Sequence, residues 1–458
     1  MTASVNHEEL ENSPALKPYY DNRKLFFRNV FWLLFGSMAG YFGLMTSMNL
    51  MPLHMEAQKM TAAQIGLAIS IRCFLAAPMM LYFAYLSDHW HWRLGRRLSF
   101  VAISLPILVV TVIIFPYTTT VLTCTMIYVA FMAGCNILSD TFPLLMYDIS
   151  KNKYWGRVSG FSWFFMFFAV WLGQVILMPM VDTHGEKIVY VICGSIMFIG
   201  IMTSIIFVKE PPIRGDKCPS LNPIPIIKSF VSLVASRQRI FLILAFVLVA
   251  CMNIPINFTP LQAKVNIGLS IGDVGTKLMQ YGTIITAIFT IFSGYAIDKI
   301  GAFRAIIIGF IFAVIAGVIG FKPDRTAEWL NHLFNLHLTA TTALAIAYTC
   351  AMIGNIGMYM SALIFATSAV GREDTAKIYA CNAAANNLFQ SLMIYLSGWM
   401  ITNIFREYYG YAYLIGIILC ALGMPIFFFL DKHRTKIIVE AKKSEMENSK
   451  GGDVDMSN

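Results

Sequence analysis

Residues 87–97 read SDHWHWRLGRR and residues 294–304 read GYAIDKIGAFR, and each stretch lies between two long apolar runs. Both stretches combine an aspartate, a glycine and basic side chains within a short polar segment. In a chain of 458 residues, the two copies lie almost half the chain length apart. We infer that one membrane-embedded half is duplicated, an internal symmetry that is typical of transporters.

The composition is that of a membrane protein. The chain is 57% hydrophobic and only 13% charged, which an ordinary soluble fold of this length does not show. A helix that spans a bilayer needs about 20 predominantly apolar residues. The sequence has twelve such runs, at residues 31–53, 65–86, 98–115, 121–145, 158–180, 188–208, 240–261, 278–297, 302–321, 340–366, 379–404 and 412–430. We therefore predict an all-α membrane protein with twelve transmembrane helices in two pseudo-symmetric six-helix bundles.

The basic residues predict the orientation of these helices. Most of the 34 Lys and Arg residues lie on the side of the membrane that holds both termini. Since positively charged loops stay in the cytoplasm, we expect both termini and both repeated loops to be cytoplasmic, in a plasma or inner membrane. The predicted order is an N-terminal cytoplasmic tail (1–28), a first bundle (29–208), a cytoplasmic linker (209–239), a second bundle (240–430) and a disordered cytoplasmic tail (431–458).

Several functions are disfavoured because their motifs are missing. The chain has no G-x-x-x-x-G-K-[ST] phosphate loop and no H-E-x-x-H metal motif. Its nine cysteines include no C-x-x-C pair, so neither a zinc site nor a disulfide framework is indicated. The net charge of +9 follows from the topology and does not require nucleic acid. We expect no enzymatic activity, no cofactor, and a monomer whose partners are the lipid bilayer, a small-molecule substrate and protons.

The second loop, G-x-x-x-D-K-x-G-x-x-R, resembles the signature that the major facilitator superfamily carries between helices 2 and 3 and again between helices 8 and 9. The first loop, S-D-x-x-x-x-R-x-G-R-R, is longer and resembles the glycoside–pentoside–hexuronide cation symporters and the related sucrose carriers. The segment from Asp148 to Gly160 is similar to the loop between helices 4 and 5 of the same branch. The resemblance implies the twelve-helix major facilitator fold and transport by alternating access.

The repeated loops are candidates for a gate. A glycine permits a tight turn, and an aspartate can accept hydrogen bonds from amides at a helix N-terminus, where the helix dipole favours negative charge. The arginines can pair with acids across the cytoplasmic seam, and in the resembled superfamily such contacts hold that side shut. Alternatively, the basic residues are only topology anchors. The predicted gating residues are Asp88, Arg93, Gly95, Arg96, Arg97, Arg157, Asp298, Lys299, Gly301 and Arg304.

Charge within the bilayer is costly and usually functional, and Asp140 lies within a predicted span. A carboxylate in a low-dielectric interior can take up a proton and release it when water reaches it. In the resembled symporters an acid on helix 4 serves both sugar and cation, and Asp140 stands near that position. We predict that Asp140 couples transport to protons, the alternative being a structural acid. Sodium is disfavoured because Cys73–Pro78 offers no side-chain oxygen as a ligand.

Polar side chains on the predicted spans supply the substrate contacts. Asn382, Asn386 and Gln390 repeat every four residues and so share one helix face. The alternative role of such residues is to join helices to one another in lipid. The predicted substrate-binding residues are Arg72, Asn136, Trp163, Gln174, Asn253, Asn257, Gln280, Asn355, Asn382, Asn386 and Gln390.

The sequence thus predicts a proton-coupled secondary active transporter of a small polar solute, sugar-like or another organic molecule. Two alternatives remain. The spacing from Pro78 to Asp88 and from Asp148 to Arg157 also resembles PucC-like proteins, which implies a tetrapyrrole carrier or a light-harvesting assembly factor. A membrane sensor that has lost transport would predict a large signalling domain, which the sequence does not show.

Overall fold

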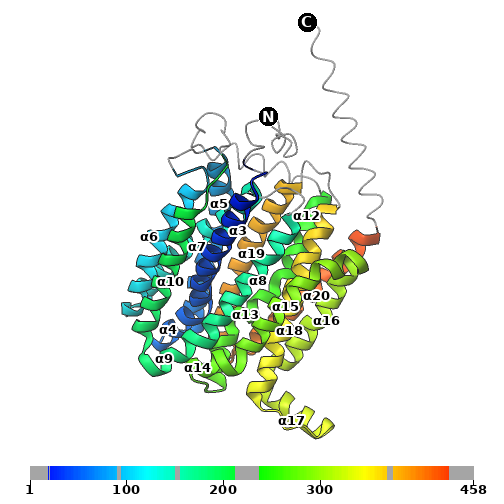
Figure 1. Ribbon diagram of the computed structural model, residues 1–458. Coiled ribbons are helices and arrows are strands. Elements are labelled where there is room, and N and C mark those ends of the chain that lie inside the picture. Colours follow the sequence, from blue (N-terminus) through cyan, green and yellow to red (C-terminus); the bar gives the residue numbers. More distant parts are fainter. Residues whose placement is uncertain are drawn as a thin grey trace.

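The computed structural model describes residues 19, 21–89, 94–149, 155–211, 237–368 and 375–432. These residues form long helices joined by short connections (Figure 1). Helices are expected here because lipid offers no hydrogen-bond partner to the backbone, which must therefore bond within its own segment. Most of the predicted tails (1–28 and 431–458) and of the predicted linker (209–239) lies outside the described residues.

The first half of the chain contains six helical spans. Span 1 is α3 (Arg23–Met45), η1 (Thr46–Leu50) and α4 (Met51–Ala57); span 2 is α5 (Ala62–His89); span 3 is α6 (Leu98–Ile114) with η2 (Phe115–Tyr117). Span 4 is α7 (Val121–Ile149); span 5 is α8 (Trp155–Leu172), η4 (Gly173–Leu177) and α9 (Met178–His184); span 6 is α10 (Glu186–Phe207).

The second half repeats this plan with one addition. Span 7 is α12 (Arg237–Val249), η5 (Ala250–Met252), α13 (Asn253–Leu261) and η6 (Gln262–Asn266); span 8 is α14 (Ile271–Asp273), η7 (Val274–Met279) and α15 (Gln280–Ile300). Span 9 is α16 (Ala302–Phe321), span 10 is α18 (Ala340–Ser368), span 11 is α19 (Thr375–Asn403) and span 12 is α20 (Tyr411–Lys432). The addition is α17 (Pro323–Phe334), a short helix between spans 9 and 10.

The predicted all-helical membrane fold is confirmed, with twelve spans within the described residues. Nine of the spans are long and apolar enough to cross a membrane by length and composition alone, when the described residues are considered. Spans 1, 8 and 11 are not among these nine, and span 11 is rich in polar residues. Span 11 owes this to its asparagines and glutamine, which the sequence places among the predicted substrate contacts.

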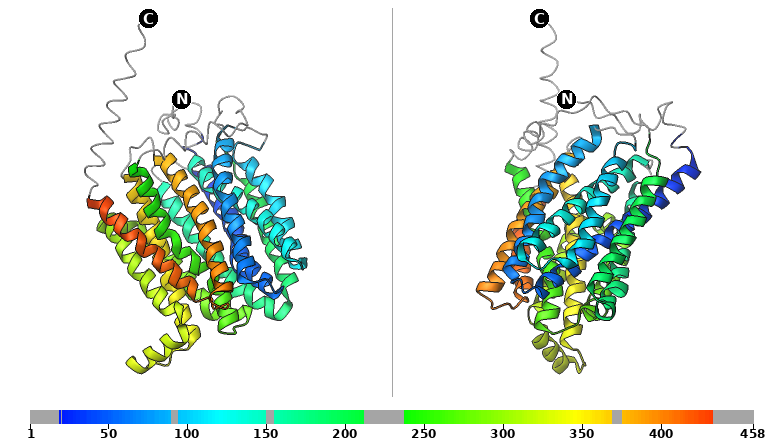
Figure 2. Two further views of the ribbon diagram at one scale, coloured as in Figure 1. Left: turned by 180° about the vertical axis from the view of Figure 1, so that it is seen from behind. Right: turned by 90° about the vertical axis from the view of Figure 1, so that its left-hand side faces the viewer.

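The two halves lie side by side, the first coloured blue to green and the second green to red (Figure 1). They meet along a seam where α5 crosses α19 and α8 packs on α15. We call the end at which α3 begins and α20 ends the terminal end, which is the upper end in both figures, and the other end the far end (Figures 1 and 2). At the far end, α4 also contacts α13, and α9 contacts α14.

Four wide π-helical turns interrupt the spans: η1 in span 1, η4 in span 5, η6 in span 7 and η7 in span 8. Each lies in the half of its span nearer the far end. The turns η4 and η7 contact each other across the seam, and η1 contacts α13. Such turns are rare and often lie at functional sites.

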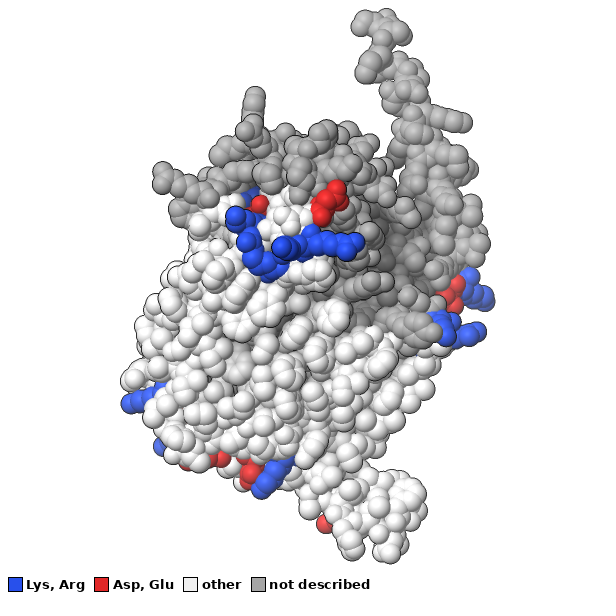
Figure 3. Space-filling view, in the orientation of Figure 1, with Lys and Arg blue, Asp and Glu red and all other residues white. Residues whose placement is uncertain are grey.

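The surface has the pattern of a protein that sits in a bilayer. In the space-filling view, charged side chains gather toward the two ends and a broad uncharged belt separates them (Figure 3). Large apolar side chains are exposed along the spans, including Ile311, Ile315 and Val318 on α16. In water such a surface would be unfavourable, whereas lipid covers it without cost.

Candidate functional site

Arg72 is the one arginine near the middle of a span among the described residues of the first half. Arg72, on α5, is enclosed by protein, and only part of its surface is accessible. Its guanidinium interacts with the Tyr128 hydroxyl and lies near Cys135, both on α7. Among the described residues, its Nη1 atom has no hydrogen-bond partner. A buried donor without a partner is costly, so a ligand or water that accepts from it is favoured.

Next to Arg72, a hydrogen bond joins the two halves. The hydroxyls of Ser70, on α5, and Ser391, on α19, lie 3.0 Å apart and are buried. Since a helix rises about 1.5 Å per residue, Arg72 lies roughly 3 Å from this bond toward the terminal end. Gln390 precedes Ser391 and lies on the same side of the bond, because α19 runs in the opposite direction to α5.

Four of the predicted substrate-binding residues gather in the second half, and we call them the amide cluster: Asn253, Asn355, Asn386 and Gln390. Asn355 donates from Nδ2 to Oδ1 of Asn253 at 3.2 Å, linking span 10 to span 7. Gln390 donates from Nε2 to Oδ1 of Asn386 at 3.2 Å and to the Ala250 carbonyl at 3.4 Å, linking span 11 to span 7. The Oδ1 atom of Asn355 is buried and has no partner among the described residues.

Gln174, in η4, is fully buried at the seam between spans 5 and 8. The Tyr348 phenol of span 10 lies near it, but neither atom of the Gln174 amide has a partner at hydrogen-bond distance within the described part of the chain. At about 1.5 Å per residue, Arg72, Gln174 and the amide cluster all lie roughly 15–25 Å from the far end. The structure therefore brings polar groups from both halves to the middle of the bundle.

The other predicted substrate-binding residues are more dispersed. Asn257 donates to the Asn253 carbonyl at 2.7 Å, and Gln280 donates to the Thr276 carbonyl, so both amides are used within their own helices. Trp163 stacks on Phe167 in α8. The Asn136 side chain is half-buried on α7, and the side chain of Asn382 lies outside the described residues.

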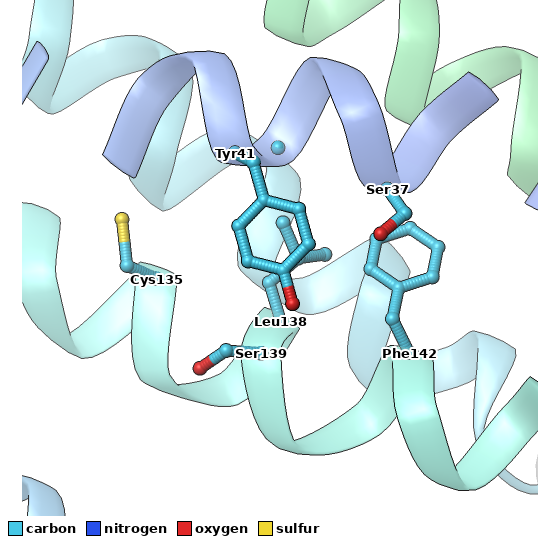
Figure 4. Close-up of a pocket in the computed structure, with 7 residues that line it drawn as sticks. Ser37, Tyr41, Cys135, Leu138, Ser139 and Phe142 are labelled. Atoms are coloured by element: carbon cyan, nitrogen blue, oxygen red, sulfur yellow. The ribbon is translucent and has the colours of Figure 1, made fainter. Parts of the chain in front are cut away.

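A narrow cavity of about 20 Å³ lies between α3 and α7 and was not foreseen from the sequence. It is lined by Ser37, Gly40, Tyr41, Cys135, Leu138, Ser139 and Phe142. Tyr41 reaches from α3 toward the α7 backbone beside Ser139 (Figure 4). Such a volume holds about one water molecule. Asp140 directly follows Ser139 in α7, and its side chain lies outside the described residues.

At the terminal end, two predicted gating arginines bind an acid of their own half. The Asp148 carboxylate, at the end of α7, accepts from Arg96 Nη2 and lies 2.6 Å from Arg97 Nε. Asp148 and Arg97 are almost fully buried. The pairing therefore fixes spans 3 and 4 to each other within the first half.

Glu210, which sequence reasoning missed, occupies the N-terminus of α6. Its carboxylate accepts from the Arg97 amide at 3.0 Å and from the Leu98 amide at 3.3 Å. Burial raises the pKa of this carboxyl, and nearby Asp148 adds to the rise, while the two amides and Arg96 oppose it. Glu210 follows span 6 in the chain, so this contact ties the start of the linker to the first half. The only sequence signal was an acid at the end of an apolar run.

The glycines of both loops adopt the conformation that a tight turn requires, as predicted. Gly95 has φ of +120° and Gly301 has φ of +86°, which other residues rarely adopt. A side chain at Gly95 would also collide with the Glu210 carboxylate. Lys299 and Arg304 are exposed at the second loop. Arg93 and the side chains of Asp88, Arg157 and Asp298 lie outside the described residues.

At the far end, ionic and polar contacts cross the seam. Lys264, in span 7, pairs with Glu56 of span 1 at 2.5 Å. Asp182, in α9, accepts from the Ser270 hydroxyl at 2.7 Å and from the Gly272 amide at 2.8 Å. Ser270 and Gly272 lie at the N-terminus of span 8, where the helix dipole favours a carboxylate. These contacts hold the two halves together at the far end.

Two six-helix halves with polar groups gathered at their seam are the architecture of many membrane transporters. The sequence matches the profile of the Major Facilitator Superfamily over residues 33–321 and 240–450, and the chain belongs to this superfamily. It is therefore a multi-pass membrane protein and a secondary transporter of a small solute, not an enzyme. Comparison with curated protein sequences found no match.

Solved structures share the fold at low sequence identity. A bacterial homologue of the human lysosomal transporter Spinster, inward-facing and unoccupied, is 14% identical with a TM-score of 0.66, over 92% of this chain and 98% of that one. A variant of the nucleoside transporter NupG is 14% identical with a TM-score of 0.67, over 89% and 99%. A POT family transporter in complex with 5-aminolevulinic acid is 11% identical with a TM-score of 0.66, over 90% and 96%.

Proposed function

We propose that this transporter moves a small polar solute across a plasma or inner membrane by alternating access, coupled to protons through Asp140, with the terminal end in the cytoplasm. The observation that carries the proposal is a set of unpartnered buried polar atoms on predicted substrate-binding residues of both halves. Within the part of the chain that the structure describes, they are Arg72 Nη1, both atoms of the Gln174 amide and Asn355 Oδ1. Because unpaired buried polar groups are unfavourable, a polar solute or its water shell is the natural partner.

The position of these atoms suits alternating access. A solute between Arg72 and the amide cluster is contacted by both halves near the middle of the membrane, where transporters of this architecture bind their substrates. The far end is held by the Lys264–Glu56 pair and by Asp182. Opening this end requires those contacts to break, so the described arrangement corresponds to a state that is closed to the outside.

The first loop and the segment from Asp148 support placement near the glycoside–pentoside–hexuronide symporters. In that branch the helix-4 acid serves the cation, which is the role we give to Asp140. The neighbouring cavity lined by Tyr41 and Ser139 has room for about one water molecule. Such a water would let a proton reach this part of α7.

The substrate class is tested first by thermal shift on the purified protein. Sugars, amino acids, nucleosides and tetrapyrroles are screened, because a specific ligand stabilises the native state by mass action. A solute that binds at the seam should stabilise wild type and lose most of this effect in Asn355→Ala. Stabilisation by tetrapyrroles alone would instead favour a tetrapyrrole carrier.

Proton coupling is tested in proteoliposomes with the solute so identified. Asp140→Asn fixes a neutral side chain, so accumulation driven by a pH gradient should fail while counterflow exchange persists. Exchange needs alternation with solute bound, whereas accumulation also needs a proton in every cycle. In Arg72→Gln, both activities should fall together, because arginine does not exchange its proton and acts on the solute. Normal pH-driven accumulation by Asp140→Asn would refute coupling through this residue.

A further inference from the structure

Helix α17 is a well-formed helix at the far end that transport does not explain. It projects from the lower end of the second half, at a steep angle to the spans beside it (Figures 1 and 2). Asn331 fastens it through two hydrogen bonds to Leu338, 2.9 Å from Nδ2 to the carbonyl and 2.6 Å from the amide to Oδ1. Asn335 ends the helix in the left-handed conformation, with φ of 51°. These contacts define where α17 ends and how the chain leaves it toward span 10.

The sequence of α17 divides its surface into three flanks. At about 100° per residue, Trp329 and Leu333 share one flank, while Asp324 and Glu328 lie roughly opposite. Ala327 lies on the third flank and is buried against the bundle, with 3% of its surface exposed. A helix that lies on a membrane beside a protein presents these three surfaces, one to lipid, one to water and one to the protein.

The apolar flank is unusually exposed. Trp329 and Leu333 have 62% and 55% of their surfaces exposed. Phe334, the last residue of the helix, and Leu336 beyond it have 61% and 44%. Lipid-facing Val318, one turn before the end of α16, is 63% exposed. The α17 side chains are thus as open as a residue that faces acyl chains. They belong to the helix that directly follows span 9 at the far end.

We propose that α17 is a membrane-surface anchor, which lies in the interface of the leaflet at the far end and inserts Trp329 and Leu333 among the lipids. Tryptophan is favoured at this boundary, and an amphipathic helix enters it by roughly 5–10 Å. The acidic side chains Asp324 and Glu328 lie on the polar flank, and Arg325, one turn before Trp329, lies at its border with the apolar flank, so the helix has no excess of positive charge. The expected partner is therefore a zwitterionic lipid such as phosphatidylcholine rather than an anionic one.

The experiment places spin labels at Leu333→Cys and Glu328→Cys in a cysteine-free background, with the protein in phosphatidylcholine liposomes. Collision with oxygen reports contact with lipid, and collision with a water-soluble nickel chelate reports contact with water. The label at 333 should be accessible to oxygen and shielded from nickel, as a reference label at Val318→Cys is. The label at 328 should show the opposite, as a reference label at the exposed Lys59→Cys does.

Two outcomes overturn the proposal. If the label at 333 is as accessible to nickel as the one at 59, the flank faces water. If the label at 333 is shielded from both reagents, and more so at high protein-to-lipid ratio, the flank is covered by a second copy of the chain. Melting temperatures of the labelled proteins show that each remains folded.

Discussion

At the crossing of α5 and α19, a substitution that adds one carbon atom should shift the equilibrium between the state that is closed at the far end and the state that is open there. Gly66 and Gly398 bring the two helices into backbone contact across the seam. A Cβ atom on Gly398 would lie 2.6 Å from the Ala62 carbonyl oxygen and 3.2 Å from the Gly66 Cα atom. Both are backbone atoms, so no side-chain rotation relieves the clash. The helices must separate, and they belong to different halves.

The size of the effect follows from the cost of overpacking. Inserting a methyl group into a packed site costs about 1–3 kcal/mol. In Gly398→Ala this cost falls on the state that is closed at the far end and is relieved when that end opens. Since about 1.4 kcal/mol corresponds to a factor of ten, the open state should gain roughly 5- to 150-fold over the closed state.

The assay is a distance measurement by electron spin resonance in a cysteine-free background. Labels at Lys59 and Asn403, both exposed at the far end on opposite halves, should show a larger population at long distance in Gly398→Ala. The matched control is Gly357→Ala in α18, whose added Cβ atom would meet its nearest neighbours at 3.9 Å. A distance distribution that is unchanged in Gly398→Ala, or changed equally in the control, would refute the reasoning.

Three further predictions concern residues outside the middle of the membrane. Lys264→Gln removes the partly exposed pair with Glu56, which is worth roughly 0.5–1 kcal/mol. The same labels should then show a shift of about 2- to 5-fold toward the open state. No shift would mean that this pair does not hold the far end. Because burial raises the pKa of the Glu210 carboxyl, the folded protein binds this proton more tightly than the unfolded chain. The free energy of unfolding should therefore fall as pH rises from about 4.5 to the raised pKa. Melting temperatures measured between about pH 4 and 7 should lose this slope in Glu210→Gln, and an identical slope in both proteins would contradict the assignment. Cys218, which lies outside the described residues, should react with maleimide only from the cytoplasm. Engineered cysteines at Thr119 and His184 should react only from outside. The opposite labelling would reverse the proposed orientation.

The helices could be predicted because long apolar runs have few alternatives in lipid. The positive φ of Gly95 and Gly301 could be predicted too, because a short turn between two spans requires it. Helix α17 was missed because it is short and its polar flank interrupts the apolar pattern. The sequence did contain one indication of this helix, because Trp329 and Leu333 are four residues apart, which is the spacing of apolar residues on one face of a helix.

The candidate site could be predicted in part. Repetition every four residues placed Asn386 and Gln390 together, and their hydrogen bond confirms this. Contacts between distant segments could not be found in this way. Nothing local in the sequence indicates that Glu210 binds the start of α6, or that Asp148 is the partner of Arg96. Such pairings depend on how the spans pack, which periodicity does not encode.

The four π-helical turns bear on how this chain should be compared with its relatives. A π-helical turn holds about one residue more than an α-helical turn. Relative to a span without such a turn, every later position is therefore shifted by one residue, which turns a side chain by about 100° around the helix axis. Gln174 lies within one such turn and Gln280 directly after another. At identities of 11–14%, alignment gaps at these turns have to be set by superposition before any residue of a relative is matched to them.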